Sequence, residues 1–357
     1  MPLPDLHAAA RLGTLNSLPP GALDLGSITA RNASGNTPLH VAARHGHLGQ
    51  IPPALLTSAT LAVKNDAGYT PLHHAASAGH LDQLPAALLN ADSLNLRSNA
   101  GYVVFHLAAA GGHLAQLPAD LVTADAFLRK TDVGNTLLHE AAENGTLDNL
   151  PGKFLTADHV AQKNLGGETV LHVAAFNGHL DQIPADLLSA PALLEVTSAG
   201  DTVFHAAAIS GHLAQIPAVF LTHKNLIGAS KTGFTAIHAA AETGQLVHIP
   251  REHLTADLLL TRNDNGDTPL HAAAHHGDAA IAGLLLLFGA DRAARNAKGL
   301  DAAALASEAS ADAGARAFFA KEGITAGVLF VLPSVFILLG LSWLHMAGGD
   351  ILWIQGL

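Results

Sequence analysis

Histidine is the residue type in this chain most able to do chemistry. The sequence contains 23 histidines and no cysteine. Imidazole can bind a metal or move a proton near neutral pH. The lack of cysteine removes disulfides, thiolate nucleophiles and cysteine-type zinc sites. Residues 70–85, TPLHHAASAGHLDQLP, show the density of imidazole in a short stretch. The first question is whether these histidines converge on one site or belong to a scaffold.

The spacing of the histidines favours a scaffold. One histidine recurs every 33 residues, at His7, His40, His73, His106, His139, His172, His205, His238 and His271. Another set follows a glycine, at His47, His80, His113, His179 and His212. A zinc site needs three or four ligands converging at about 2.0–2.1 Å for nitrogen. Equivalent positions of stacked repeats lie one repeat apart, so we expect hydrogen-bonded ladders rather than a metal site.

Other candidate motifs are incomplete. His271 and His275 lie four residues apart with His276 adjacent, but two nitrogen ligands make a weak site, and incidental surface histidines are the better interpretation. His139 and Glu140 begin like a metalloprotease motif, but the second histidine is missing from HEAAE. We find no glycine-rich phosphate loop and no G-x-S-x-G elbow. The sequence predicts no catalytic, cofactor or metal site, and no small-molecule substrate.

The elements that position the histidines share the same interval. A glycine recurs every 33 residues, at Gly35, Gly68, Gly101, Gly134, Gly167, Gly200, Gly233, Gly266 and Gly299. The motif TPLHVAARHGHL (37–48) has the relatives TPLHHAASAGHL and TPLHAAAHHGD. A threonine suited to cap a helix precedes proline or small apolar residues, and a glycine ends the helix. Leucine and alanine at fixed offsets form a narrow apolar face.

This motif resembles the ankyrin repeat, from about Asp5 to Gly323. The resemblance implies a hairpin-like turn at N-x-x-G and two antiparallel helices in each unit. The expected fold is therefore all-α, an ankyrin-repeat solenoid with a C-terminal transmembrane helix. We expect an N-terminal capping repeat at 1–35, eight 33-residue repeats at 36–299 and closing helices at 300–323.

A proline departs from the ankyrin pattern in most units. It lies where the second helix should run, at Pro19, Pro52, Pro85, Pro118, Pro151, Pro184, Pro217 and Pro250. Proline inside a helix costs about 3 kcal/mol, so we expect each one in the first turn of a helix, where its N–H is not needed. Five residues later stand good helix caps, Asp24, Thr57, Asn90, Thr123, Thr156, Ser189, Thr222 and Thr255. We predict a short extra helical turn after each cap, and an ordinary ankyrin unit only at 267–299.

The C-terminal segment has a different character. Residues 324–349 contain no Asp, Glu, Lys or Arg. This charge-free stretch is longer than the roughly 20 residues needed to cross a bilayer. We predict a transmembrane helix at 324–347 and a short tail at 348–357. Arg316 and Lys321 precede the span and no Lys or Arg follows it, so the expected location of the repeats is the cytoplasm. The alternative is a helix pair, broken at Pro333, that docks on the last repeat.

Function is inferred from charge and from the resemblance. The net charge of −11 and the lack of a basic cluster argue against nucleic acid as a partner. The resemblance implies binding of a protein on the concave face, not catalysis. The candidate partner-binding residues are Arg44, His45, Asp66, Tyr69, Tyr102, Glu143, Phe176, Phe234, Glu242, Asp267, His275 and His276.

Ordinary packing between adjacent turns explains the aromatic residues of this set equally well. The leading hypothesis is a membrane-anchored scaffold for a cytoplasmic protein, which also contacts the lipid bilayer through 324–347. The alternative is a structural or assembly protein whose C-terminal helix oligomerises in the membrane.

Overall fold

The computed structural model describes residues 5–309, without the side chains of 307–309. The expected transmembrane helix at 324–347, the tail at 348–357 and the second half of the closing segment lie outside the described residues. Within 5–309, no helix is long and apolar enough to cross a membrane. The described chain is helical throughout, and its β-structure is limited to two isolated bridges, Lys163 with Thr169 and Ala229 with Thr235.

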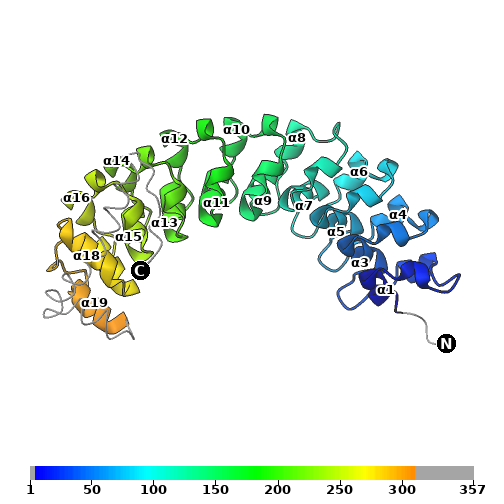
Figure 1. The fold of residues 1–357 in the computed structure, drawn as a ribbon, viewed down its shortest axis with the longest axis horizontal. Coiled ribbons are helices and arrows are strands. Elements are labelled where there is room, and N and C mark those ends of the chain that lie inside the picture. The colour runs from blue at the N-terminus through cyan, green and yellow to red at the C-terminus, as the bar shows by residue number, and fades with distance from the viewer. Residues whose placement is uncertain (1–4, 310–357) are drawn as a thin grey trace, which may run out of the picture. The chain divides into compact units, whose positions relative to one another are not determined.

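The chain forms two compact units, Met1–Ala206 and Ala207–Leu357. In the first unit, the first helices of successive repeats lie side by side in one row on the inner side of this unit's bend (Figure 1). They are α1 (Leu6–Leu12), α3 (Pro38–His45), α5 (Pro71–Ala78), α7 (Val104–Ala110), α9 (Leu137–Asn144) and α11 (Val170–Asn177). Helix α13 (Val203–Ile209) spans the boundary between the units.

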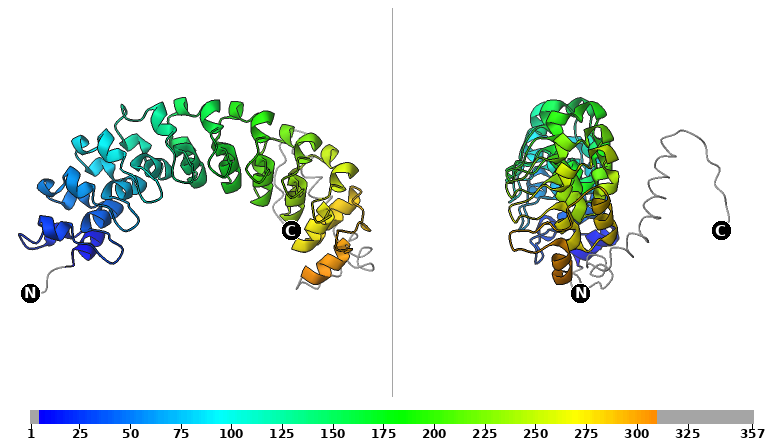
Figure 2. Two further views of the ribbon diagram at one scale, coloured as in Figure 1. Left: turned by 180° about the vertical axis from the view of Figure 1, so that it is seen from behind. Right: turned by 90° about the vertical axis from the view of Figure 1, so that its left-hand side faces the viewer.

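A second row in this unit consists of very short helices, seen from behind in Figure 2. They are α2 (Leu25–Ile28), α4 (Ser58–Leu61), α6 (Ala91–Leu94), α8 (Ala124–Phe127), α10 (Ala157–Val160) and α12 (Ala190–Leu193). Each follows one of the predicted caps, and the cap side chain accepts a backbone N–H of the helix in all six. The predicted capped turns of this unit are therefore confirmed.

The prolines occupy a slightly different place from the one we expected. In the second repeat, a 3₁₀ turn at Leu48–Gln50 comes first, and another at Pro53–Leu55 follows directly after Pro52. The carbonyl of Pro52 accepts the N–H of Leu55 at 2.8 Å. Pro52 is thus the residue before a 3₁₀ turn, not part of the first turn of an α-helix. The physical reason for the prediction still holds, because no N–H is required at this position.

The core lies between the two rows and is built from repeated leucines and alanines. Leu39, Ala42, Ala43 and Leu48 have no exposed surface, and Leu61 of the second row has 1%. Burial of one leucine side chain contributes about 1.5–3 kcal/mol. The small alanines let neighbouring first helices approach closely, which holds the inner row in register.

The second unit continues with α14 (His223–Leu226), α15 (Ala236–Glu242), α16 (Ala256–Leu259), α17 (Pro269–His276), α18 (Ala279–Leu287) and α19 (Ala302–Ala309). Helix α18 is a continuous second helix of nine residues, capped by Asp278. This agrees with the expectation that 267–299 is an ordinary unit. Helix α19 is the described part of the predicted closing helices.

Candidate functional site

The histidine of each TPLH-like motif joins two repeats. The backbone N–H of Thr37 donates to Nδ1 of His40 at 3.0 Å, and the Thr37 hydroxyl lies 2.8 Å from the same nitrogen. Because Nδ1 accepts a backbone N–H, the ring proton is on Nε2. Nε2 donates it to the carbonyl of Tyr69, in the next repeat, at 3.0 Å. One neutral imidazole therefore caps its own helix and ties it to the following turn.

The same arrangement recurs along the chain. The turn carbonyls that accept from His73, His139, His172, His238 and His271 are those of Tyr102, Glu168, Asp201, Asp267 and Leu300. Burial lowers the pKa of His40, His73, His106 and His139 to about 4, so these rings stay neutral near pH 7. The predicted hydrogen-bonded ladder is confirmed.

The second set of histidines packs on glycine. Nδ1 of His47 lies 2.8 Å from the carbonyl oxygen of Ala10 in the preceding repeat. A Cβ at Gly13 would lie 2.7 Å from Nε2 of the same ring. Gly13 also has φ of +71°, which side chains rarely adopt. The glycine is thus required both for the helix end and for the histidine that lies over it.

A glutamine clasp completes the scaffold. Nε2 of Gln50 donates to the carbonyl of Gly13 at 2.9 Å, and its Oε1 accepts the N–H of Leu15 at 3.0 Å. The carbonyls of Gly46, Gly79 and Gly145 accept in the same way from Gln83, Gln116 and Gln182. The sequence analysis missed these residues, although their spacing of 33 residues, or 66 between the last two, is visible in the sequence.

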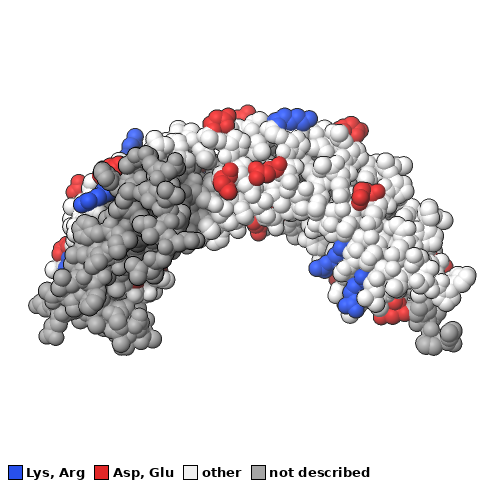
Figure 3. Space-filling view, viewed as in Figure 1, with Lys and Arg blue, Asp and Glu red and all other residues white. Residues whose placement is uncertain are grey.

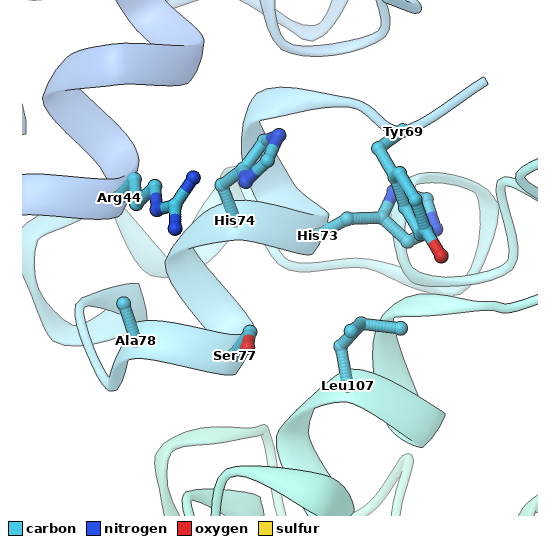
Figure 4. Close-up of a pocket in the computed structure, with 7 residues that line it drawn as sticks. All are labelled: Arg44, Tyr69, His73, His74, Ser77, Ala78 and Leu107. Atoms are coloured by element: carbon cyan, nitrogen blue, oxygen red, sulfur yellow. The ribbon is translucent and has the colours of Figure 1, made fainter. Parts of the chain in front are cut away.

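Two predicted binding residues of the first unit meet in a pocket of about 380 Å³. Arg44 and Tyr69 line it together with His73, His74, Ser77, Ala78 and Leu107. Figure 4 shows the guanidinium of Arg44 directed towards the ring of His74, across the groove from Tyr69 and Leu107. The Tyr69 ring centroid lies 6.3 Å from that of Tyr102 and 5.5 Å from that of His73. Tyr69 therefore packs against Tyr102 and the scaffold as well as lining the pocket.

His74 differs from every histidine of the ladder. Its Nε2 is buried without a hydrogen-bond partner among the described residues. Burial, together with the charge of Arg44, lowers its pKa to about 4. The equivalent residues of the neighbouring repeats are Val41 and Leu107. A polar ring at an otherwise apolar position was the signal in the sequence that this residue is special.

Glu140 is a second polar residue of the same row. It is only 4% exposed, and its Oε1 accepts from Nδ2 of Asn135 at 3.0 Å. Burial raises its pKa to about 7, and the neighbouring Glu143 adds to the shift. Burial and the adjacent Glu140 carboxylate raise the pKa of Tyr102 to about 12. The predicted residues Tyr102 and Glu143 thus adjoin a buried carboxyl group that we had dismissed as a broken metalloprotease motif.

The second unit brings together four other predicted residues. Phe234, Glu242, Asp267 and His275 line a pocket of about 340 Å³. Nδ1 of His275 lies 4.0 Å from Oε1 of Glu242. Among residues 5–309, no group of three or more His, Asp or Glu side chains is placed to hold a metal ion.

Comparison with known families identifies the repeat. A model of three consecutive ankyrin repeats matches residues 6–98, and a model of a single ankyrin repeat matches residues 265–297. The chain contains ankyrin repeats. No curated protein matches it. Between the two matched segments, the same spacing of histidine and glycine continues.

The remaining predicted residues do not join either pocket. Asp66, at the tip of an ankyrin turn, pairs with Arg31 at 2.7 Å, so its carboxylate braces two turns. Phe176 is 54% exposed on the first helix of its ankyrin repeat. His45 and His276 are exposed at the ends of α3 and α17. Charged side chains are sparse on the described surface that Figure 3 presents, so each exposed charge has a larger influence on what this surface can bind.

Proposed function

We propose that this chain is a scaffold that binds a protein partner through the row of first helices in its ankyrin repeats. One observation carries this proposal. The ladder histidine is the same from repeat to repeat and bonds within the frame, whereas the outward position four residues after it varies along the chain. In the first unit it is Arg11, Arg44, Ser77, Ala110, Glu143 and Phe176. A regular frame that displays varied side chains is suited to recognition.

Ankyrin-repeat proteins generally act by binding rather than by catalysis. Aromatic and arginine side chains dominate the energy of protein interfaces. Arg44 and Phe176, on first helices, and Tyr69, in the turn before α5, supply both types. Burying the exposed Phe176 side chain in a complex is favourable, because it removes apolar surface from water.

We further propose that residues 324–347 anchor the chain in a membrane, with the repeats in the cytoplasm. Thirteen of these residues are Leu, Ile, Val or Phe. At about −0.3 to −0.6 kcal/mol each, they favour insertion by roughly 4–8 kcal/mol. The basic residues Arg316 and Lys321 precede the segment, which supports the proposed orientation.

Affinity capture tests the scaffold proposal. The full chain is compared with a variant in which Arg44, Tyr69, Glu143 and Phe176 become alanine. A matched control replaces the exposed residues Asp92, Asp125 and Asp158 of the second row with alanine. We expect saturable capture of a protein by the wild type and the control, and its loss in the inner-row variant. Equal capture by all three chains would contradict the proposal.

Fractionation tests the anchor. The full chain is expected in the membrane fraction, and a chain ending at residue 323 in the soluble fraction with an unchanged urea-unfolding transition. If both chains remain soluble, the anchor proposal fails and the scaffold proposal is unaffected.

A further inference from the structure

The pocket of the first unit contains a positive charge that the protein itself does not neutralise. Arg44 is exposed and forms no ion pair within the described residues, and no Asp or Glu lines the pocket. Two other arginines of this unit are different. Arg31 pairs with Asp66 at 2.7 Å and Arg97 with Asp132 at 2.8 Å. Arg44 therefore lacks the carboxylate that its counterparts at the turns have.

The wall beside Arg44 contains an unused hydrogen-bonding group. His74 reaches the pocket from α5, and its Nε2 has no partner among the described residues. A buried polar atom without a partner destabilises the folded state, so native structures rarely retain one without a reason. The terminal torsion of a histidine ring is broad. A modest rotation lets the ring donate a hydrogen bond to a group bound in the pocket.

The other walls restrict what the ligand can be. Tyr69, Ala78 and Leu107 present an aromatic ring and aliphatic groups. A guanidinium binds one carboxylate with two parallel hydrogen bonds. A phosphate dianion would bring a second negative charge that no other cation of the lining could balance. The volume of about 380 Å³ exceeds that of a carboxylate alone, so there is room for an apolar neighbour against Tyr69 and Leu107.

We infer that this pocket binds an acidic side chain of the protein partner, with an adjacent apolar residue packed on Tyr69 and Leu107. Arg44 forms the ion pair, and His74 donates the hydrogen bond. This inference rests on the proposed function and names the partner chemistry at one place on the inner row. The pocket of the second unit offers a contrast, because Glu242 and Asp267 already supply carboxylates there.

Peptide selection tests the inference. A phage library of random 12-residue peptides is selected on the immobilised full chain, and the affinities of enriched peptides are measured by fluorescence polarisation. We expect Asp or Glu next to an apolar residue in the enriched peptides. Arg44→Ala should weaken binding at least tenfold. Arg129→Ala, which removes an exposed arginine outside the pocket, should leave affinity unchanged.

A double-mutant cycle assigns the contact. Replacing the acidic residue of the peptide by its amide should weaken binding to the wild type as much as Arg44→Ala does, with no further loss when both changes are combined. His74→Leu should weaken binding several-fold without lowering the urea midpoint, and His74→Gln should restore part of the affinity. A loss of binding that only follows a lower urea midpoint would indicate a structural role for His74.

Several outcomes overturn the inference. Enriched peptides without an acidic residue would do so, as would acidic peptides that bind Arg44→Ala and the wild type equally. Tighter binding of a phosphoserine peptide would assign the pocket to phosphate instead. Failure to enrich any peptide, while the inner row still captures its protein partner, would remove this inference and leave the scaffold proposal intact.

Discussion

His73 and His74 are neighbours on α5, yet they belong to two different regions of the repeat. Both nitrogens of His73 are bonded, Nδ1 to the N–H of Thr70 and Nε2 to the carbonyl of Tyr102. The Nε2 of His74 has no partner among the described residues. His139 and Glu140 on α9 also differ. His139 continues the ladder, whereas Glu140 is a buried carboxyl group that accepts from Asn135.

The difference shows how the chain separates stability from recognition. The ladder uses the same residue in repeat after repeat. Its members His40, His73, His106 and His139 are neutral near pH 7 and are hydrogen-bonded within the frame. The position directly after the ladder histidine is mainly apolar from repeat to repeat. A polar residue at this position, such as His74 or Glu140, therefore lowers the stability of the fold. A polar residue that lowers stability where the frame needs no polar group is a physical indication of function.

Acid should produce the largest effect, because it acts on many ladder histidines together. The folded-state pKa of His40, His73, His106 and His139 is lowered from 6.5 to about 4. Their contribution to stability is therefore complete above pH 6.5 and is lost progressively as the pH falls from 6.5 to 4. Each shift corresponds to about 3 kcal/mol, so the sum is on the order of 10 kcal/mol. Urea unfolding between pH 7.5 and 4 measures it, and a constant midpoint down to pH 5 would refute the ladder account.

Replacing single histidines compares the ladder position directly with the position that follows it. His73→Ala removes two hydrogen bonds, leaves the Thr70 N–H without its acceptor and opens a cavity, while the Tyr102 carbonyl keeps only its bond from the Ser98 N–H. We expect a loss of about 3–5 kcal/mol in unfolding free energy. His74→Ala on the same helix should cost less than about 1 kcal/mol, because no hydrogen bond is lost. Urea denaturation of both variants at pH 7.5 distinguishes the two positions. Equal losses of unfolding free energy would show that both positions contribute equally to stability.

Glu140→Gln probes the second polar residue that directly follows a ladder histidine. The folded-state pKa of Glu140 is raised from 4.5 to about 7, so its ionisation destabilises the fold as the pH rises from 4.5 to 7. The variant removes this penalty and can still accept from Asn135. It should unfold at a free energy higher by up to about 3 kcal/mol at pH 8, with no gain near pH 4.5.

The control for that experiment is Glu143→Gln, which changes an exposed carboxylate beside the same site. Its effect should be small at both pH values. If Glu143→Gln stabilises the chain at pH 8 as much as Glu140→Gln does, repulsion between the two carboxylates is the cause rather than the burial of Glu140.

The sequence predicted the features that recur in each repeat and depend only on residues close in the chain. The interval of 33 residues located the first helices, and the caps such as Thr57 located the short helices, because a cap acts on the next three residues. The 3₁₀ turn before each proline, and the one that follows every proline except Pro19 and Pro118, were not predicted. A 3₁₀ turn and the first turn of an α-helix have similar local preferences, and the packing of the two rows decides between them.

The site was less accessible because it depends on several repeats at once. Arg44, His74 and Leu107 come from three consecutive first helices, and the pocket exists only in their packed arrangement. Asp66 shows the same dependence on a neighbouring repeat. Its place at a turn tip suggested partner binding, but Arg31 of the preceding turn occupies its carboxylate. The sequence alone does not show which charged groups find a partner within the fold.

The smallest predicted effect concerns the second row, where the residue types recur but the bonds differ. Thr57 Oγ1 accepts the N–H of Thr60 at 3.2 Å, and the Thr57 N–H donates to the Thr60 hydroxyl at 3.0 Å. Thr255 occupies the equivalent position before α16 without a side-chain capping bond. Thr57→Ala should therefore cost about 1 kcal/mol, and Thr255→Ala only a few tenths of that. Urea denaturation measures both. Equal costs would mean that the backbone turns, not the caps, hold these short helices, and the second row would then belong with the ladder as part of the frame.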